Sequence, residues 1–165
     1  MLNLLPSVLI LGLAAFAAWF LAWRRRSGVE SEAERNSAAR MLSIAVVVQS
    51  VHFAEEALTG FHTRLPGLFN LPEIPLGAFL LFNLLWIGAW ILSVPGLRSA
   101  RPLAFFAAWF LAIAGMINGI AHPLLALASG GYFPGLWTSP IIGGVCVLLW
   151  RRLQKATHRR SSELL

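Results

Sequence analysis

Residues 40–59 read RMLSIAVVVQSVHFAEEALT, an apolar run that is long enough for a membrane helix and yet contains ionisable side chains. Positions i, i+3 and i+4 of a helix are neighbours on its surface. His52, Glu55 and Glu56 therefore crowd one face of the predicted helix. Because ionisable groups at membrane depth are costly and usually serve a function, this stretch is the first candidate for a functional site.

The composition of the whole chain agrees with a membrane protein. The chain has 165 residues, of which 58% are hydrophobic and 12% charged, with a net charge of +6. This apolar fraction exceeds that of an average soluble domain, and the apolar runs approach the roughly 20 residues that cross a bilayer. The basic residues flank these runs and form no basic face with interleaved aromatic residues, which excludes a nucleic-acid binder. We predict one all-α, polytopic membrane helical bundle.

Hydropathy and helix-breaking residues predict about five transmembrane helices. The expected spans are residues 2–23, 40–59, 76–94, 103–129 and 136–150. Arg24-Arg25-Arg26 closes the first span, which no charge precedes, so we expect a retained helix rather than a cleaved signal peptide. Gly60 stops the second span, Pro95-Gly96 ends the third, and Pro123 interrupts the fourth.

The predicted organisation has four parts. These are a first transmembrane helix with its basic stop (1–26), a cytoplasmic linker (27–39), a four-helix membrane core (40–150) and a basic cytoplasmic tail (151–165). Within the core, the segment 61–75, FHTRLPGLFNLPEIP, has prolines that break regular structure and apolar residues that disfavour free solvation. We expect this segment to lie in the membrane interface or to fold back over the bundle as a lid.

The orientation follows from the positive-inside rule. Five spans with the N-terminus outside put every Lys and Arg except Arg64 on the cytoplasmic side, whereas four or six spans do not give this partition. The C-terminus is then cytoplasmic. The expected location is the bacterial inner (cytoplasmic) membrane, as a multi-pass protein.

Helix rise predicts a shared polar layer in the outer half of the membrane. At about 1.5 Å per residue, polar side chains of the second, third and fourth spans reach similar depths. They are His52, Glu55, Glu56, Asn83, Asn118 and His122, with Gln49 just beneath them and Tyr132 in a turn above them. Asn83 and Asn118 could instead be hydrogen-bonding residues between helices. His122 could bond a carbonyl that Pro123 leaves free.

The residue types of this layer suit metal chemistry. Histidine and carboxylate are the ligands of catalytic zinc sites, which combine three protein ligands with an open position, and they also suit iron or manganese. We expect His52, Glu55, Glu56 and His122 to bind a divalent metal, with His52, Glu55 and Glu56 as catalytic residues. Without a metal, the two carboxylates would share a proton, so that one acts as acid and the other as base. His52 would then relay protons.

Three motifs occur in a characteristic order. They are the HxxEE sequence His52-Phe53-Ala54-Glu55-Glu56, the later histidine His122, and the YxPG sequence Tyr132-Phe133-Pro134-Gly135. In these motifs, over residues 41–150, the chain resembles the HXXEE family of uncharacterised bacterial integral membrane proteins. The resemblance implies a membrane protein with an active site at His52, Glu55, Glu56 and His122, and it implies no particular reaction.

The favoured function is a metal-dependent enzyme that acts on a lipid-like or other apolar small-molecule substrate, with membrane lipid as its surroundings. A second hypothesis is a metal-free acid/base enzyme, such as a lipid isomerase or cyclase, that uses the same carboxylates. A third is a non-enzymatic protein, either a proton-coupled carrier or a cofactor binder with a haem between His52 and His122. The sequence has no detectable inverted repeat, which weakens the carrier hypothesis.

Overall fold

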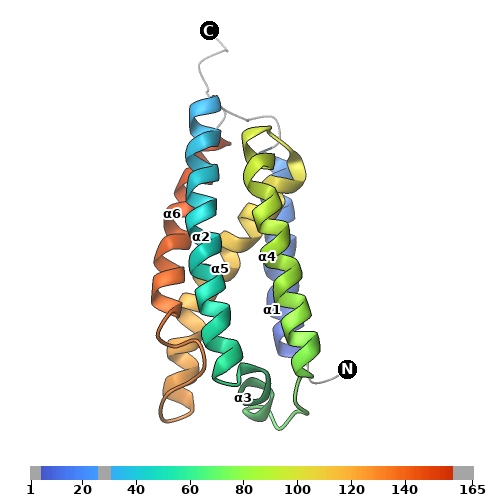
Figure 1. The fold of residues 1–165 in the computed structure, drawn as a ribbon, viewed down its shortest axis with the longest axis vertical. Helices are drawn as coiled ribbons and strands as arrows, with labels where there is room; N and C mark the ends of the chain where they lie inside the picture. Colours follow the sequence, from blue (N-terminus) through green and yellow to red (C-terminus); the bar gives the residue numbers. More distant parts are fainter. Residues whose placement is uncertain (1–4, 26–30, 158–165) are drawn as a thin grey trace.

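The computed structural model describes residues 5–25 and 31–157, and all regular secondary structure in these ranges is helical. The helices are α1 (Leu5–Arg24), α2 (Glu32–Leu58), α3 (Phe61–Gly67), α4 (Leu76–Arg98), α5 (Pro102–Ala128) and α6 (Ser139–Ala156). The long helices run along the long axis of the molecule, and the short α3 lies at one end, between α2 and α4 (Figure 1). The predicted all-α fold is confirmed.

Helix α5 forms the centre of the bundle, where it packs against α1, α2, α4 and α6. Its side chains at Ala108, Trp109 and Leu111 are fully buried. Glycines let α5 and α6 approach closely, because a Cβ atom on Gly119 would lie 2.8 Å from the Cα atom of Gly143. Small residues at such crossings are typical of membrane bundles. This crossing fixes α6 against α5, and with it the loop that joins them.

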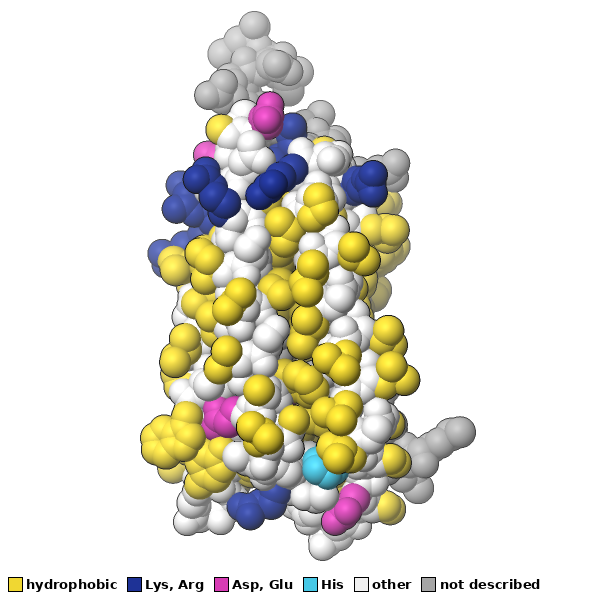
Figure 2. Space-filling model, viewed as in Figure 1, with side chains coloured by type: hydrophobic (Ala, Val, Ile, Leu, Met, Phe, Trp, Pro, Cys, Tyr) yellow, Lys and Arg dark blue, Asp and Glu magenta, His cyan; other side chains and the backbone are white. Residues whose placement is uncertain are grey.

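Three described helices, α2, α4 and α5, are long and apolar enough to cross a membrane by length and composition. Large apolar side chains remain exposed on the bundle, among them Val47, Leu85, Leu92 and Leu127. Figure 2 shows apolar side chains along most of one face and basic side chains gathered mainly at one end. Exposed apolar surface of this extent is what contact with lipid requires. The structure thus agrees with a membrane protein.

Helix α2 begins earlier than the sequence predicts, since residues 32–39 are helical rather than a solvated linker. Glu32 and Glu34 lie in its first turn, where acidic side chains interact favourably with the helix dipole. Ala38 and Ala39, one turn further along, are fully buried, so this added part of α2 also packs into the core. The remainder of the predicted linker up to residue 30, and residues 158–165 of the predicted tail, lie outside the described residues.

The two prolines predicted to end the third span and to interrupt the fourth lie inside continuous helices. Pro95 is in the last turn of α4, and its own carbonyl still accepts a hydrogen bond from the Ser99 N–H at 3.1 Å. Pro123 lies in α5, which continues to Ala128. A proline removes one N–H donor, and packed neighbouring helices tolerate this loss in membrane bundles.

The last helix is shifted towards the C-terminus relative to the predicted span 136–150. Residues 136–138 belong to the preceding turn, and α6 starts at Ser139 with a proline in its first turn. It continues past Arg151 and Arg152 because Leu149, Leu153 and Ala156 are fully buried on one side of it. Part of the predicted tail is therefore helix.

The segment 61–75 contains the short helix α3 rather than irregular chain throughout. Gly60, with φ +81°, separates α2 from α3, as predicted for a helix stop. Because Pro66 has no N–H, the His62 carbonyl has no partner one turn later, and it accepts the Ile74 N–H at 2.9 Å instead. This bond folds the segment back on itself. The folded segment covers the end of the bundle, where the ring centres of Phe61 and His122 lie 5.5 Å apart.

Candidate metal centre

Three ionisable side chains meet in a buried cluster near the end of α2. His52 and Glu56 are one turn apart on α2, and His122 reaches them from α5. Oε1 of Glu56 lies 3.5 Å from Nε2 of His52 and 3.3 Å from Nε2 of His122. The exposed fractions of His52, Glu56 and His122 are 0%, 6% and 2%. The structure thus brings three residues of the predicted polar layer together in one cluster.

The proton of His122 is fixed by a backbone group. Nδ1 of His122 lies 2.6 Å from the carbonyl oxygen of Pro134. A carbonyl oxygen can only accept a hydrogen bond, so Nδ1 of this imidazole carries the proton. In the neutral ring, Nε2 then has a free lone pair, and this lone pair faces Glu56. The partner carbonyl is that of Pro134, and not one left free by Pro123.

His52 has its own partner on the opposite side of its ring. Nδ1 of His52 lies 2.8 Å from Oγ1 of Thr138, a residue that the sequence did not single out. Nε2 of His52 points the other way, towards Glu56 and towards Nδ2 of Asn118 at 3.3 Å. The two imidazoles are nearly perpendicular, with ring centres 4.8 Å apart. Rings in edge contact leave no room for a porphyrin between them, which argues against the haem alternative.

The cluster fits a divalent cation. When each Nε2 is unprotonated, it is an acceptor like the carboxylate oxygen, and acceptors cannot bond one another. Buried acceptors that face each other are costly unless a cation or a proton lies between them. One ligand atom from each residue lies within 4.8 Å of the other two. In a tetrahedral zinc site, neighbouring ligand atoms are about 3.3–3.4 Å apart, close to the 3.3 and 3.5 Å found here.

Glu55 is not part of this cluster, contrary to the prediction that it is a metal ligand. Its Oε1 accepts hydrogen bonds from the Tyr132 hydroxyl at 2.8 Å and the Trp137 N–H at 3.1 Å. Its Oε2 accepts the N–H of Thr138 at 2.9 Å and pairs with the Thr138 hydroxyl at 2.5 Å. These contacts use the accepting capacity of the carboxylate. Among the described contacts, no hydrogen bond joins Glu55 to Glu56, so the pair shares no proton.

The segment Tyr132–Thr138, hereafter the strap, closes the cluster from the outside. Phe133 is fully buried and packs beside His122. The Pro134 carbonyl accepts the hydrogen bond from Nδ1–H of His122. Gly135 has φ +86°, and a Cβ atom there would lie 2.6 Å from His122 and 2.9 Å from His52. Both imidazole rings therefore pack directly against Gly135, at a position where any other side chain would clash with them. Tyr132 was predicted to lie in a turn above the polar layer, and here the YxPG sequence also forms part of the site.

Tyr132 is the fixed end of the strap. Its hydroxyl donates to Glu55, and its carbonyl oxygen accepts a hydrogen bond at 3.2 Å from the guanidinium of Arg64, which follows α2 in the chain. Partial burial raises the pKa of Tyr132 above that of a free phenol, so the hydroxyl keeps its proton and remains a donor at neutral pH. The strap is thus held to both α2 and α3.

The other predicted supporting residues divide into two groups. Asn118 contacts the cluster through the Nδ2 atom already described. Gln49 is buried one turn below His52, with no described hydrogen bond to the cluster. Asn83 donates from Nδ2 to the Phe79 carbonyl at 2.9 Å, within its own helix α4, and is not part of the cluster contacts.

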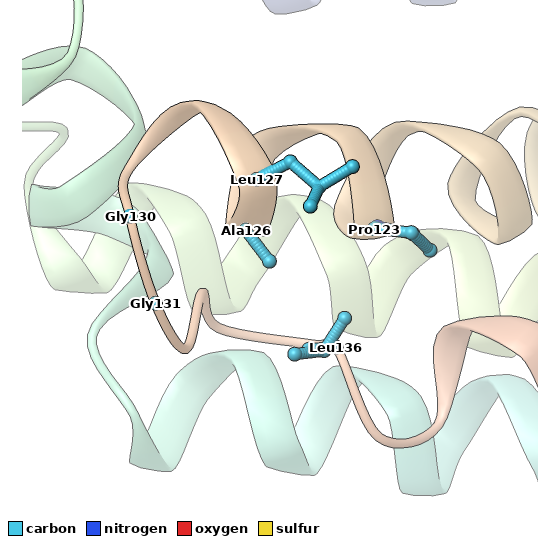
Figure 3. Close-up of a pocket in the computed structure, with 6 residues that line it drawn as sticks. All are labelled: Pro123, Ala126, Leu127, Gly130, Gly131 and Leu136. Atoms are coloured by element: carbon cyan, nitrogen blue, oxygen red, sulfur yellow. The ribbon is translucent and has the colours of Figure 1, made fainter.

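An open apolar pocket of about 450 Å³ lies beside the site. The final turns of α5 and the loop that leads into the strap form its walls, and the side chain of Leu136 points from the strap towards α5 (Figure 3). The lining residues are Pro123, Ala126, Leu127, Gly130, Gly131 and Leu136. Two of them adjoin site residues in the chain, since Pro123 follows His122 and Leu136 follows Gly135.

Comparison of the chain with protein-family models, with curated proteins and with solved structures gave no match. The interpretation of the site therefore depends on its own geometry.

Proposed function

We propose that this protein is a membrane enzyme that binds one divalent metal ion through His52, Glu56 and His122 and acts on a lipid-like substrate. One observation carries the proposal: both imidazoles direct Nε2 at the same carboxylate oxygen, at 3.5 and 3.3 Å. Three protein ligands leave an open coordination position, as in catalytic zinc sites. A bound ion would supply Lewis-acid chemistry, and the protein residues would hold it in a dry, closed chamber.

The membrane topology and the family of the chain are also inferred. We infer five spans, with the N-terminus outside and the site in the outer half of the bacterial inner membrane. The exposed apolar surface and the basic residues near one end support this orientation. Membership of the HXXEE family is supported by the position of its motifs, because the HxxEE histidine, the later histidine and the YxPG turn meet at one point.

The apolar pocket favours a substrate with a hydrocarbon chain. Its walls are apolar, and its volume lies within the usual range of small-molecule sites. Its lining residue Leu127 is itself exposed, as is Leu124, the residue after Pro123 in the chain. In a membrane, such a surface faces lipid, so a lipid chain can enter the pocket sideways while its polar end approaches the strap.

The metal site is tested by titrating detergent-purified, metal-free protein with Zn²⁺ or Co²⁺. We expect one ion per chain, and we expect Glu56→Gln to bind at least about 10-fold more weakly, because the variant loses the charged ligand. Glu73→Gln is the matched control, since Glu73 is an exposed carboxylate of the outer loop. Failure of the wild type to bind either ion would overturn the metal site.

The catalytic part is tested in vesicles made from bacterial lipid extract. Mass spectrometry should detect a lipid that the metal-loaded wild type converts and that Glu56→Gln leaves unchanged. A wild type that binds metal and converts no lipid would contradict the enzyme proposal while leaving the metal site intact.

A metal-free acid/base enzyme is the second candidate, and the contact between Asn118 Nδ2 and His52 Nε2 at 3.3 Å favours it. The Asn118 amide can donate a hydrogen bond to the Nε2 lone pair of His52. A single proton between Glu56 and Nε2 of His122 can satisfy the lone pair of His122. This alternative predicts lipid conversion that survives exhaustive chelation. The metal proposal predicts that chelation abolishes conversion and that added Zn²⁺ or Co²⁺ restores it.

A further inference from the structure

We propose that Thr138 and Glu55 are positioning residues of the metal centre, which hold the Nδ1 proton of His52 so that Nε2 faces Glu56 and His122. This inference rests on the proposed metal site. It assigns a role to two residues that offer no ligand atom to the cluster. A short chain of hydrogen bonds runs from Glu55 through Thr138 to His52.

The first link is the charge of Glu55. Its carboxylate receives the Tyr132 hydroxyl at 2.8 Å, the Trp137 N–H at 3.1 Å and the Thr138 N–H at 2.9 Å. Each oxygen of a carboxylate can accept two hydrogen bonds, and here both oxygens of Glu55 face donors. Glu55 therefore has no proton to give to a further neighbour.

The second link is the direction of the Thr138 hydroxyl. Its oxygen lies 2.5 Å from Oε2 of Glu55, the length of a charge-assisted hydrogen bond between a hydroxyl and a carboxylate. Because ionised Glu55 has no proton, the hydroxyl must be the donor in this bond. A hydroxyl has one proton, so the Thr138 oxygen can only accept from any other partner.

The third link fixes the imidazole. The remaining partner of the Thr138 oxygen is Nδ1 of His52 at 2.8 Å, so Nδ1 must carry the proton. The Pro134 carbonyl imposes the same tautomer on His122 by a separate route. Histidines that bind metals almost always donate their second N–H to an oxygen in this way, and loss of such a partner typically costs 10–100-fold in metal affinity.

The variants Thr138→Val and Thr138→Ser separate this role from packing. Zn²⁺ affinity, measured by competition with a chelating dye, should fall roughly 10–100-fold in Thr138→Val and stay close to wild type in Thr138→Ser, which restores the hydroxyl. Thr157→Val is the matched control, because Thr157 also carries a bonded hydroxyl at the far end of α6. Wild-type affinity in Thr138→Val, or no rescue by Thr138→Ser, would overturn the inference.

The tautomer of His52 can also be measured directly in the wild-type protein, so this test does not depend on the folding of a variant. In metal-free protein labelled with ¹⁵N-histidine, His52 should show the Nδ1–H tautomer in the wild type and lose this preference in Thr138→Val. An Nε2–H tautomer in the wild type would refute the role of Thr138. If the wild type binds no metal but shows the Nδ1–H tautomer, the metal proposal fails and the hydrogen-bond chain stands.

Discussion

Gly135 is the residue that the two imidazoles depend on most directly. Replacement by Ala places a Cβ atom 2.6 Å from Nδ1 and Cε1 of His122, at a position with φ +86°. The strained backbone alone costs about 1–3 kcal/mol. We expect Gly135→Ala to lower the free energy of unfolding by at least that amount and to weaken Zn²⁺ binding about 10-fold or more, since the ligands themselves must move.

The control for this prediction lies in the same loop. A Cβ atom on Gly131 meets no heavy atom within 4 Å, so Gly131→Ala should change neither the unfolding temperature in detergent nor the Zn²⁺ affinity. Equal effects of the two substitutions would mean that Gly135 supports the loop and not the histidines.

At this scale the sequence predicted the residues of the cluster better than their surroundings. Helical spacing alone brings His52 and Glu56 together, and helix rise brings His122 to the same depth. Spacing could not tell Glu55 from Glu56, because both lie about one turn from His52. The choice depends on the N–H groups of Trp137 and Thr138, which lie far away in the chain. The Pro134 carbonyl is a backbone group and leaves no trace in side-chain patterns.

Among the elements, the crossing of α5 and α6 tolerates least change. A Cβ atom on Gly119 would lie 2.8 Å from the Cα atom of Gly143, and a backbone atom cannot rotate away. We expect Gly119→Ala to destabilise the protein by about 1–3 kcal/mol in detergent unfolding, as overpacking does. Gly144→Ala meets no heavy atom within 4 Å, so it should be neutral or stabilising by up to about 1 kcal/mol through helix propensity. A stabilised Gly119→Ala variant would show that the helices can separate at no cost.

Element positions were predictable from hydropathy, whereas element ends were not. Each misplaced end involves a contact outside the local sequence. In the turn before α6, the N–H groups of Trp137 and Thr138 donate to Glu55, a residue of a distant helix. Helix α4 passes Pro95 because the following turn packs tightly, with a Cβ atom on Gly96 placed 2.7 Å from that of Ala104. Local rules for proline and glycine describe the isolated chain, and packing overrides them here.

At the scale of the whole molecule, the bundle has two different ends. The basic ends of α1, α4 and α6 lie together at one end of the bundle, and the strap and α3 lie at the other. In the strap and α3, Arg64 is the single Lys or Arg. By the positive-inside rule, we propose that the basic end lies in the cytoplasm. In this proposed orientation, the proposed metal centre lies near the outer leaflet, and its substrates would be lipids or apolar molecules that reach that side.

This orientation predicts a labelling pattern in intact bacterial cells. Glu73→Cys lies in the exposed segment before α4, and Ser99→Cys lies in the exposed turn after it, at the other end of the same helix. A membrane-impermeant maleimide should label Glu73→Cys in intact cells and label Ser99→Cys only after the membrane is permeabilised. The native Cys146 is buried and provides an unlabelled background. The reverse pattern would place the strap in the cytoplasm, and substrates would then have to come from the inner leaflet.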